Sequence, residues 1–295
     1  MRGTIAKPFG VVRGSVLVLL LSLLLAPAAT ARGMVFEVSR GGLAPSYLVG
    51  TMHSEDPRVM GLMSEFGPLI GQVDTVVVEL VPDAVTMLAV GAAMLLPAEQ
   101  SLRATIGAQR FRALTSAAER RGLSTLMLDR LQPWAAAVTL GMPAVESGRF
   151  LDMEIYLEAL RHRRRVVGLE TAAEQLSVFT TMPRTVQLQL LDAMVKNIDR
   201  LPTQLEQLTA AYIGGKLDRL DAVAREQYVD MSPEITRWFD DILLNRRNAR
   251  MLERLSAMLD GQRLLVAVGA MHLSGDSGLL VGLRRLGFRV ARWGG

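Results

Sequence analysis

The chain contains only three histidines, and two of them stand in the same four-residue frame near opposite ends of the sequence. Gly50-Thr51-Met52-His53 follows the apolar run Tyr47-Leu48-Val49, and Gly269-Ala270-Met271-His272 follows the apolar run 264–268. An apolar run that ends in glycine and then presents histidine is typical of a strand whose carboxyl end carries chemistry. Ligands bind at that edge in open α/β sheets. We therefore expect both imidazoles in one crevice; two unrelated core histidines, each bonded to a backbone carbonyl, are the simpler alternative.

Two acidic residues end apolar runs in the same way. Glu79 closes the β-branched run 73–78, and Glu170 follows Val166-Val167-Gly168-Leu169. Burying a carboxylate at a strand end is unfavourable unless a cation or strong donors compensate its charge. A divalent metal is one such cation, and two imidazoles plus a carboxylate, with a position left for water, form the open arrangement of zinc hydrolases. Such a metal lowers the pKa of its bound water and polarises a carbonyl group.

Arginine is the competing source of positive charge, and Asn245-Arg246-Arg247-Asn248 lies on a predicted late helix. If an arginine compensates the acids, the histidines act directly as general bases and no metal is needed. Arg247 then orients a carboxylate or stabilises an oxyanion. A salt bridge on the helix surface is the alternative for this residue.

Several other chemistries are excluded by what the sequence lacks. Without cysteine there is no thiol nucleophile, no thiolate metal site and no disulfide. The chain has no G-x-S-x-G elbow and no H-E-x-x-H helix, so an ordinary serine hydrolase and the commonest metalloprotease plan are not expected.

The apolar runs also indicate the elements that must position these residues. Residues 34–40 alternate apolar and polar and 41–45 turn the chain into 46–51, which predicts a β-hairpin. We expect an α/β fold with a small mixed β-sheet, helices packed around it and two large helical insertions at about 83–163 and 171–259. The last strand–helix–strand unit is expected to be parallel. Further strands are expected at 73–80, 166–170, 264–268 and 288–293.

The first 31 residues have the layout of a secretory signal peptide. Arg2, Lys7 and Arg13 precede the apolar run Val16–Leu25, and Ala29-Thr30-Ala31 is a small-x-small cleavage site. We expect cleavage after Ala31, a periplasmic or secreted protein without stable membrane insertion, and a single domain over 32–295; an uncleaved anchor is the alternative. Cleavage leaves 30 basic and 29 acidic residues, so nucleic acid is not an expected partner.

The order of these motifs resembles the TraB/GumN family over essentially the whole mature chain. The matching segments are Tyr47–His53 with Asp56-Pro57-Arg58-Val59, Val76–Glu79, Gly168–Thr171 with Glu174-Gln175-Leu176, Arg247-Asn248, and Val268–Gly275. The family includes the animal Tiki proteins, membrane-associated metalloproteases that trim Wnt ligands. It is also thought to share a fold with erythromycin esterases and haem-uptake proteins of the ChaN type.

By this resemblance, the paired Gly-x-x-His histidines and an acidic residue form the active site. Met271 departs from the pattern, because the family often has glycine directly before the second histidine. We expect this bulkier neighbour to narrow the pocket, so the resemblance does not define the substrate.

The resulting prediction is an exported metal-dependent hydrolase, a peptidase acting on a peptide or another small polar substrate. His53, Glu79 and His272 are the predicted ligands of a divalent transition metal (Mn, Co or Zn). Glu170 is a fourth ligand or the general base, with Arg247 and Asn248 as further catalytic residues. Two alternatives stay open: a metal-independent, esterase-like hydrolase with His53 or His272 as base, and a non-catalytic protein that binds a metal, haem or a polysaccharide fragment.

Overall fold

The computed structural model describes residues 34–42, 44–143, 147–227 and 231–294. All of them belong to one unit of the chain, Ala31–Gly295. The predicted signal peptide, 1–31, lies outside the described residues. None of the described helices combines the length and the apolar character needed to cross a membrane.

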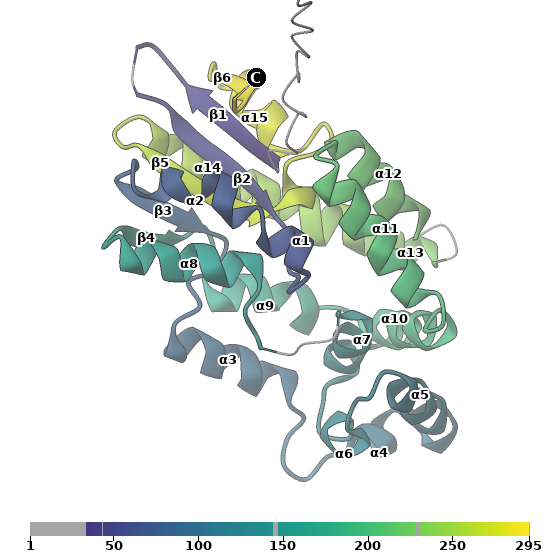
Figure 1. Cartoon of the computed structure of the whole chain (residues 1–295). Helices are drawn as coiled ribbons and strands as arrows, with labels where there is room; N and C mark the ends of the chain where they lie inside the picture. Colours follow the sequence, from purple (N-terminus) through teal and green to yellow (C-terminus); the bar gives the residue numbers. More distant parts are fainter. Residues whose placement is uncertain (1–33, 43, 144–146, 228–230, 295) are drawn as a thin grey trace, which may run out of the picture. The chain divides into compact units, whose positions relative to one another are not determined.

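The described residues form a six-stranded mixed sheet, in the order β4-β3-β5-β2-β1-β6 (Figure 1). Neighbours among β4, β3, β5 and β2 are parallel, whereas β1 is antiparallel to both β2 and β6. With helices packed around it, this sheet confirms the predicted α/β class. The strands are β1 Met34–Ser39, β2 Ser46–Thr51, β3 Thr75–Val78, β4 Arg165–Gly168, β5 Leu264–Gly269 and β6 Arg289–Arg292.

The predicted hairpin is confirmed by the antiparallel pairing of β1 with β2. Gly41 and Gly42 in the turn between them have φ of 59° and 78°, a backbone region that glycine enters without strain. The last strand differs in its neighbours. β6 runs parallel to β5 as expected, but β2 and β1 lie between them because β6 pairs with β1.

The four parallel strands end at one edge of the sheet. Thr51 of β2 lies opposite Gly269 of β5, and Val78 of β3 lies opposite both Ala267 of β5 and Gly168 of β4. The residues that follow these ends therefore share one edge, called here the carboxyl edge. The ends of the four strands therefore converge at this edge.

Helices fill the connections between the strands. The link from β2 to β3 holds α1 Pro57–Met60 and α2 Met63–Ile70, and the link from β5 to β6 holds a 3-10 turn, Ala270–His272, and α15 Leu279–Arg285. Between β3 and β4 lie α3 Ala84–Met94, α4 Leu102–Ile106, α5 Ala108–Arg120, α6 Thr125–Leu128, α7 Pro133–Gly141 and α8 Leu151–Arg161. Between β4 and β5 lie α9 Ala172–Thr180, α10 Arg184–Lys196, α11 Leu201–Ile213, α12 Leu217–Glu226, α13 Pro233–Arg237, a π-helix over Trp238–Asn245, and α14 Arg246–Leu259.

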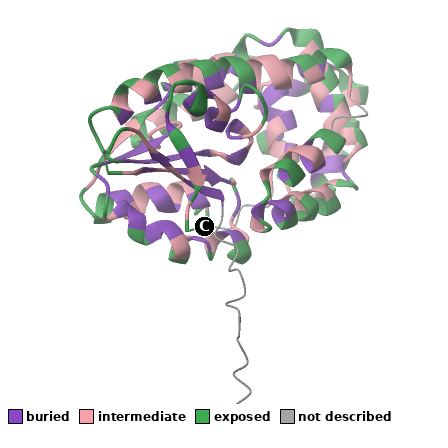
Figure 2. Ribbon diagram, turned by 90° about the horizontal axis from the view of Figure 1, so that it is seen from above, coloured by how far each residue is buried: buried purple, intermediate pink, exposed green. Residues whose placement is uncertain are grey.

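Among the described residues, buried apolar side chains form two clusters. The larger one surrounds the sheet, whose strands are mostly buried (Figure 2). The smaller one contains only helical and loop residues, among them Leu102, Leu114, Leu140 and Leu191 from α4, α5, α7 and α10. It therefore joins the helices inserted before β4 to a helix inserted after it.

Candidate functional site

Arg247 is the centre of a buried polar cluster at the carboxyl edge. It lies at the start of α14 on the buried face that also includes Met251 and Leu255, so its side chain points inward. Its Nε lies 3.0 Å from both carboxylate oxygens of Glu170, and its Nη2 lies 2.6 Å from Glu170 Oε2 and 2.6 Å from Glu79 Oε2. One guanidinium thus holds the two strand-end carboxylates together.

The surroundings of Glu79 and Arg247 favour the charged form of each side chain. Burial opposes ionisation of Glu79, yet the neighbouring His272 and Arg247 and a hydrogen bond from the Gly269 N–H hold its pKa below the ordinary value. Burial likewise opposes the charge of Arg247, but the hydrogen bonds to Glu170 and the charge of Glu79 raise its pKa. Each buried charge therefore depends on the others.

His272 lies in the same cluster, and its burial favours the neutral imidazole. Its Nε2 is 3.1 Å from Arg247 Nη1, and its Nδ1 is 2.6 Å from Asn248 Oδ1. Because arginine can only donate, Nε2 accepts and the Nδ1–H donates to Asn248. Burial lowers the pKa of His272. Asn248 donates in turn to the carbonyl of Ser277 at 3.1 Å, which fixes its amide orientation.

His53 lies at the end of β2 with different partners. Its Nδ1 is 2.8 Å from Asp152 Oδ2, and its ring stacks on Phe150 with the ring centroids 3.6 Å apart. The side chain is 48% exposed. Among the residues that the structure describes, none makes a hydrogen bond to its Nε2.

The structure therefore brings five predicted site residues into one network: Glu79, Glu170, Arg247, Asn248 and His272. Among the described residues, no hydrogen bond or ion pair joins His53 to these five; it bonds to Asp152 and stacks on Phe150. Sequence reasoning missed Asp152. An acid in the first turn of a helix is an ordinary feature, and nothing local connects it to a histidine 99 positions away.

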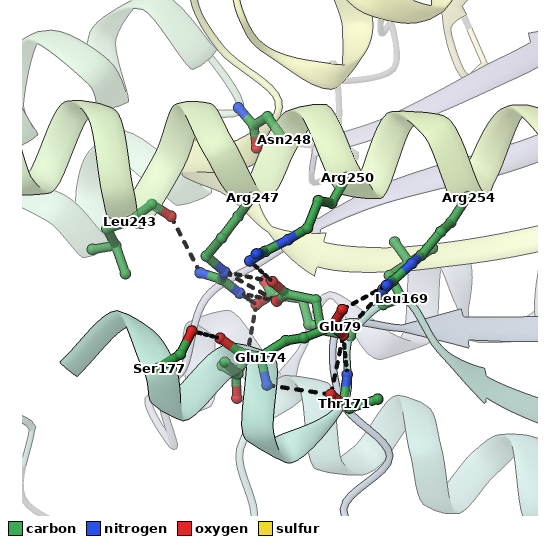
Figure 3. Close-up of polar contacts among 12 residues, drawn as sticks. Glu79, Leu169, Thr171, Glu174, Ser177, Leu243, Arg247, Asn248, Arg250 and Arg254 are labelled. Atoms are coloured by element: carbon green, nitrogen blue, oxygen red, sulfur yellow. Dashed lines mark hydrogen bonds and ion pairs between the residues drawn. The ribbon is translucent and has the colours of Figure 1, made fainter. Parts of the chain in front are cut away.

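Two further arginines of α14 extend the network, and sequence reasoning missed both. Arg250 Nη2 lies 3.3 Å from Glu170 Oε1, and Arg254 Nη2 lies 2.6 Å from Glu174 Oε1. Figure 3 shows Arg247, Arg250 and Arg254 pointing from α14 toward the side on which Glu79 and Glu174 lie. Their spacing of three and four residues places them on one helix face, a signal that the sequence does contain.

The structure requires glycine at the first position of the two Gly-x-x-His frames for two different reasons. The Gly269 N–H donates to Glu79 Oε1 at 2.6 Å, and a Cβ at this position would lie 3.1 Å from the same oxygen. A Cβ at Gly50 would lie 2.8 Å from the side chain of Leu273 and 3.2 Å from the backbone of Ala270. Gly269 thus makes room for a site carboxylate, whereas Gly50 lets β2 approach the turn after β5.

Two of the three predicted metal ligands, Glu79 and His272, already bind Arg247. Glu79 accepts hydrogen bonds from Gly269 and Arg247, and His272 Nε2 accepts one from Arg247. A guanidinium does not lose its proton. The Glu79 oxygen and the His272 nitrogen that would bind a metal therefore already face the positive charge of Arg247. Within the described ranges, no three His, Asp or Glu side chains form a group able to hold a metal.

This fold and site define a class of α/β protein in which one buried arginine joins carboxylates at the carboxyl edge of a mixed sheet. The chain belongs to the TraB/PrgY/gumN family, whose sequence pattern matches residues 34–292. No curated protein and no solved structure matches it.

Proposed function

We propose that this protein is a hydrolase in which His53 is the general base that activates water at the carboxyl edge. The contact between His53 and Asp152 is the observation that carries this proposal. Asp152 accepts the Nδ1–H, which orients the ring and leaves Nε2 free to take a proton from water. The half-exposed position gives substrate and water access to that nitrogen.

Glu79 is the second group in this proposal, as a hydrogen-bond acceptor for the substrate. It is more exposed than Glu170 or Arg247, and the bonds from Arg247 and Gly269 fix its orientation. His53 and Glu79 follow β2 and β3, which flank β5 and so run about 10 Å apart. A small polar substrate or a peptide segment lying across the end of β5 can reach both residues.

Arg247 is a positioning residue in this mechanism. It is buried behind Glu79, and its positive charge is matched by two carboxylates. Its task is to keep Glu79 ionised and correctly placed, and His272 and Asn248 support it from the other side.

The metal-dependent hydrolase is the second candidate. The observation that favours it is the adjacency of β2, β5 and β3, which carry or immediately precede His53, His272 and Glu79. It requires Arg247 to release Glu79 and His272. A metal bound there would supply an activated water.

The deciding experiment is turnover on ester and peptide libraries, with and without a chelator and with added Mn, Co or Zn. We expect both His53→Gln and Asp152→Asn to lower kcat. For His53→Gln, which removes the base, the expected decrease in kcat is about 10²–10⁴-fold. His162→Gln is the matched control, because the third histidine is also partly exposed and paired with an acid, Glu158. We expect this variant and chelation to leave kcat unchanged.

Other outcomes of this experiment identify the competing candidates. Loss of activity on chelation, with recovery on metal addition and loss of bound metal in His272→Ala, supports the metal-dependent hydrolase. Absence of turnover on every substrate, with ligand binding that depends on His53, supports a binding protein.

We also propose that the protein is exported, on the basis of the predicted signal peptide. N-terminal sequencing of the protein released by cells tests this, and a chain starting at Arg32 is expected. An intact Met1 product in the membrane fraction contradicts cleavage.

A further inference from the structure

Helix α3, Ala84–Met94, exposes an apolar surface to solvent. Val85 is 77% exposed and Leu88 is 74% exposed, with Met87 between them also exposed. Every residue of the helix is exposed or partly exposed. No charged residue occurs from Ala84 to Ala98, so the whole stretch is apolar or weakly polar.

This composition is unusual for a helix on the surface of a soluble domain. Such helices bury one apolar stripe and turn a charged face to water. An apolar stretch of about 10–14 residues is typical of a core helix, of a signal peptide or of a segment at a membrane interface. α3 is not in the core and lies well inside the chain, so the interfacial case is the one that agrees with its position.

α3 is connected to the carboxyl edge both along the chain and through the helix on which it packs. It follows β3 after the short segment that contains Glu79, and it packs on α9, which follows Glu170 (Figure 1). Backbone hydrogen bonds from Gln132 to Met94 and from Leu96 to Arg130 tie its end to the chain after α6. α6 itself exposes Leu126 and Met127.

The start of the fold lies at the same edge. Met34, the first residue of β1, pairs with Gly50 near the carboxyl end of β2. The chain has 33 residues before this point, including the apolar run Val16–Leu25. The eight residues between Leu25 and Met34 span at most about 28 Å when extended. A membrane that holds the N-terminal segment before cleavage is therefore within reach of the carboxyl edge.

We propose that α3 is a docking surface for a lipid bilayer and that it brings the carboxyl edge of the sheet to the membrane surface. A helix of 11 residues is about 17 Å long, whereas the hydrocarbon core of a bilayer is about 30 Å thick. α3 therefore lies in the interface without spanning it. The absence of charge predicts binding through apolar contacts, with little dependence on anionic lipid or on salt.

The lack of cysteine makes a direct test possible. A single cysteine introduced by Leu88→Cys in the full chain carries an environment-sensitive dye, and phosphatidylcholine vesicles are the probe. We expect a blue shift of the dye emission on addition of vesicles and quenching by spin-labelled lipid. Leu160→Cys and Leu286→Cys are matched controls, because both residues are exposed leucines outside α3, and no shift is expected for them.

A second variant separates the role of α3 from that of the N-terminal segment. The dye is placed at Met87→Cys, and Val85→Asp with Leu88→Asp is added in the same chain. Both sites are exposed, so the fold tolerates the change. We expect the vesicle concentration needed for half of the blue shift to rise at least about tenfold. An unchanged vesicle titration overturns the proposal. A blue shift that depends on protein concentration without vesicles also overturns it and assigns α3 to a second copy of the chain.

Discussion

At the scale of single residues, the central finding is that Arg247 compensates the buried carboxylate of Glu170 and the partly exposed carboxylate of Glu79. Removing one partner of a buried ion pair leaves an uncompensated charge, whereas a surface pair contributes little. We expect Arg247→Met to lower the free energy of unfolding by about 3–5 kcal/mol. Arg246→Met is the control, because Arg246 is exposed and paired with Asp241, and we expect a change within about 0.5 kcal/mol. Urea unfolding of both variants measures the difference; equal costs would show that the buried network does not hold the site.

At the scale of elements, the carboxyl edge depends on a close approach between β2 and the turn after β5. We expect Gly50→Ala to destabilise the protein by about 1–3 kcal/mol, because its Cβ would meet Leu273 and the backbone of Ala270. Gly91→Ala in α3 is the matched change, since a Cβ there has open space and alanine favours a helix interior. For this variant we expect a gain of about 0.5–1 kcal/mol. Thermal unfolding compares the two, and a loss at Gly91 would contradict the observed position of α3.

The start of α9 supplies a second prediction at this scale, on pH. Glu174 completes a capping box with Thr171, and the hydrogen bonds from Arg254 and Thr171 lower the pKa of its carboxyl from 4.5 to about 2. Because the folded state disfavours protonation, this stabilisation is present above pH 4.5 and is lost as the pH falls toward 2. We expect Glu174→Gln to cost about 1 kcal/mol at pH 7 and nearly nothing at pH 2. Urea unfolding at both pH values, with exposed Glu119→Gln as control, measures this; a cost independent of pH would argue against the charge.

At the scale of the molecule, the smaller buried cluster lies away from the site residues that follow the strands. We therefore expect a change in this cluster to affect stability but not kcat. Leu114 and Leu191 belong to the helical cluster, whereas Glu79 and Glu170 follow the ends of β3 and β4. We expect Leu114→Ala to lower the free energy of unfolding by about 2–5 kcal/mol. At a temperature where this variant is still folded, its kcat on any substrate found should match that of the wild type. A large loss of kcat in the folded state would show that the helical cluster also shapes the site.

The sequence by itself determined the features that depend on neighbouring residues. Apolar runs located the strands, their polar ends located Glu79, Glu170 and His272, and the family pattern followed from the motif order. Only the tertiary structure decided which charged side chains pair with one another. Arg247 lies 77 positions from Glu170, and Asp152 lies 99 positions from His53. Such pairs depend on how helices pack on the sheet, and no local pattern encodes the direction of a side chain across that distance. The sequence predicted a cation beside the buried acids, and the fold placed a guanidinium there because α14 turns Arg247 toward the ends of β3 and β4.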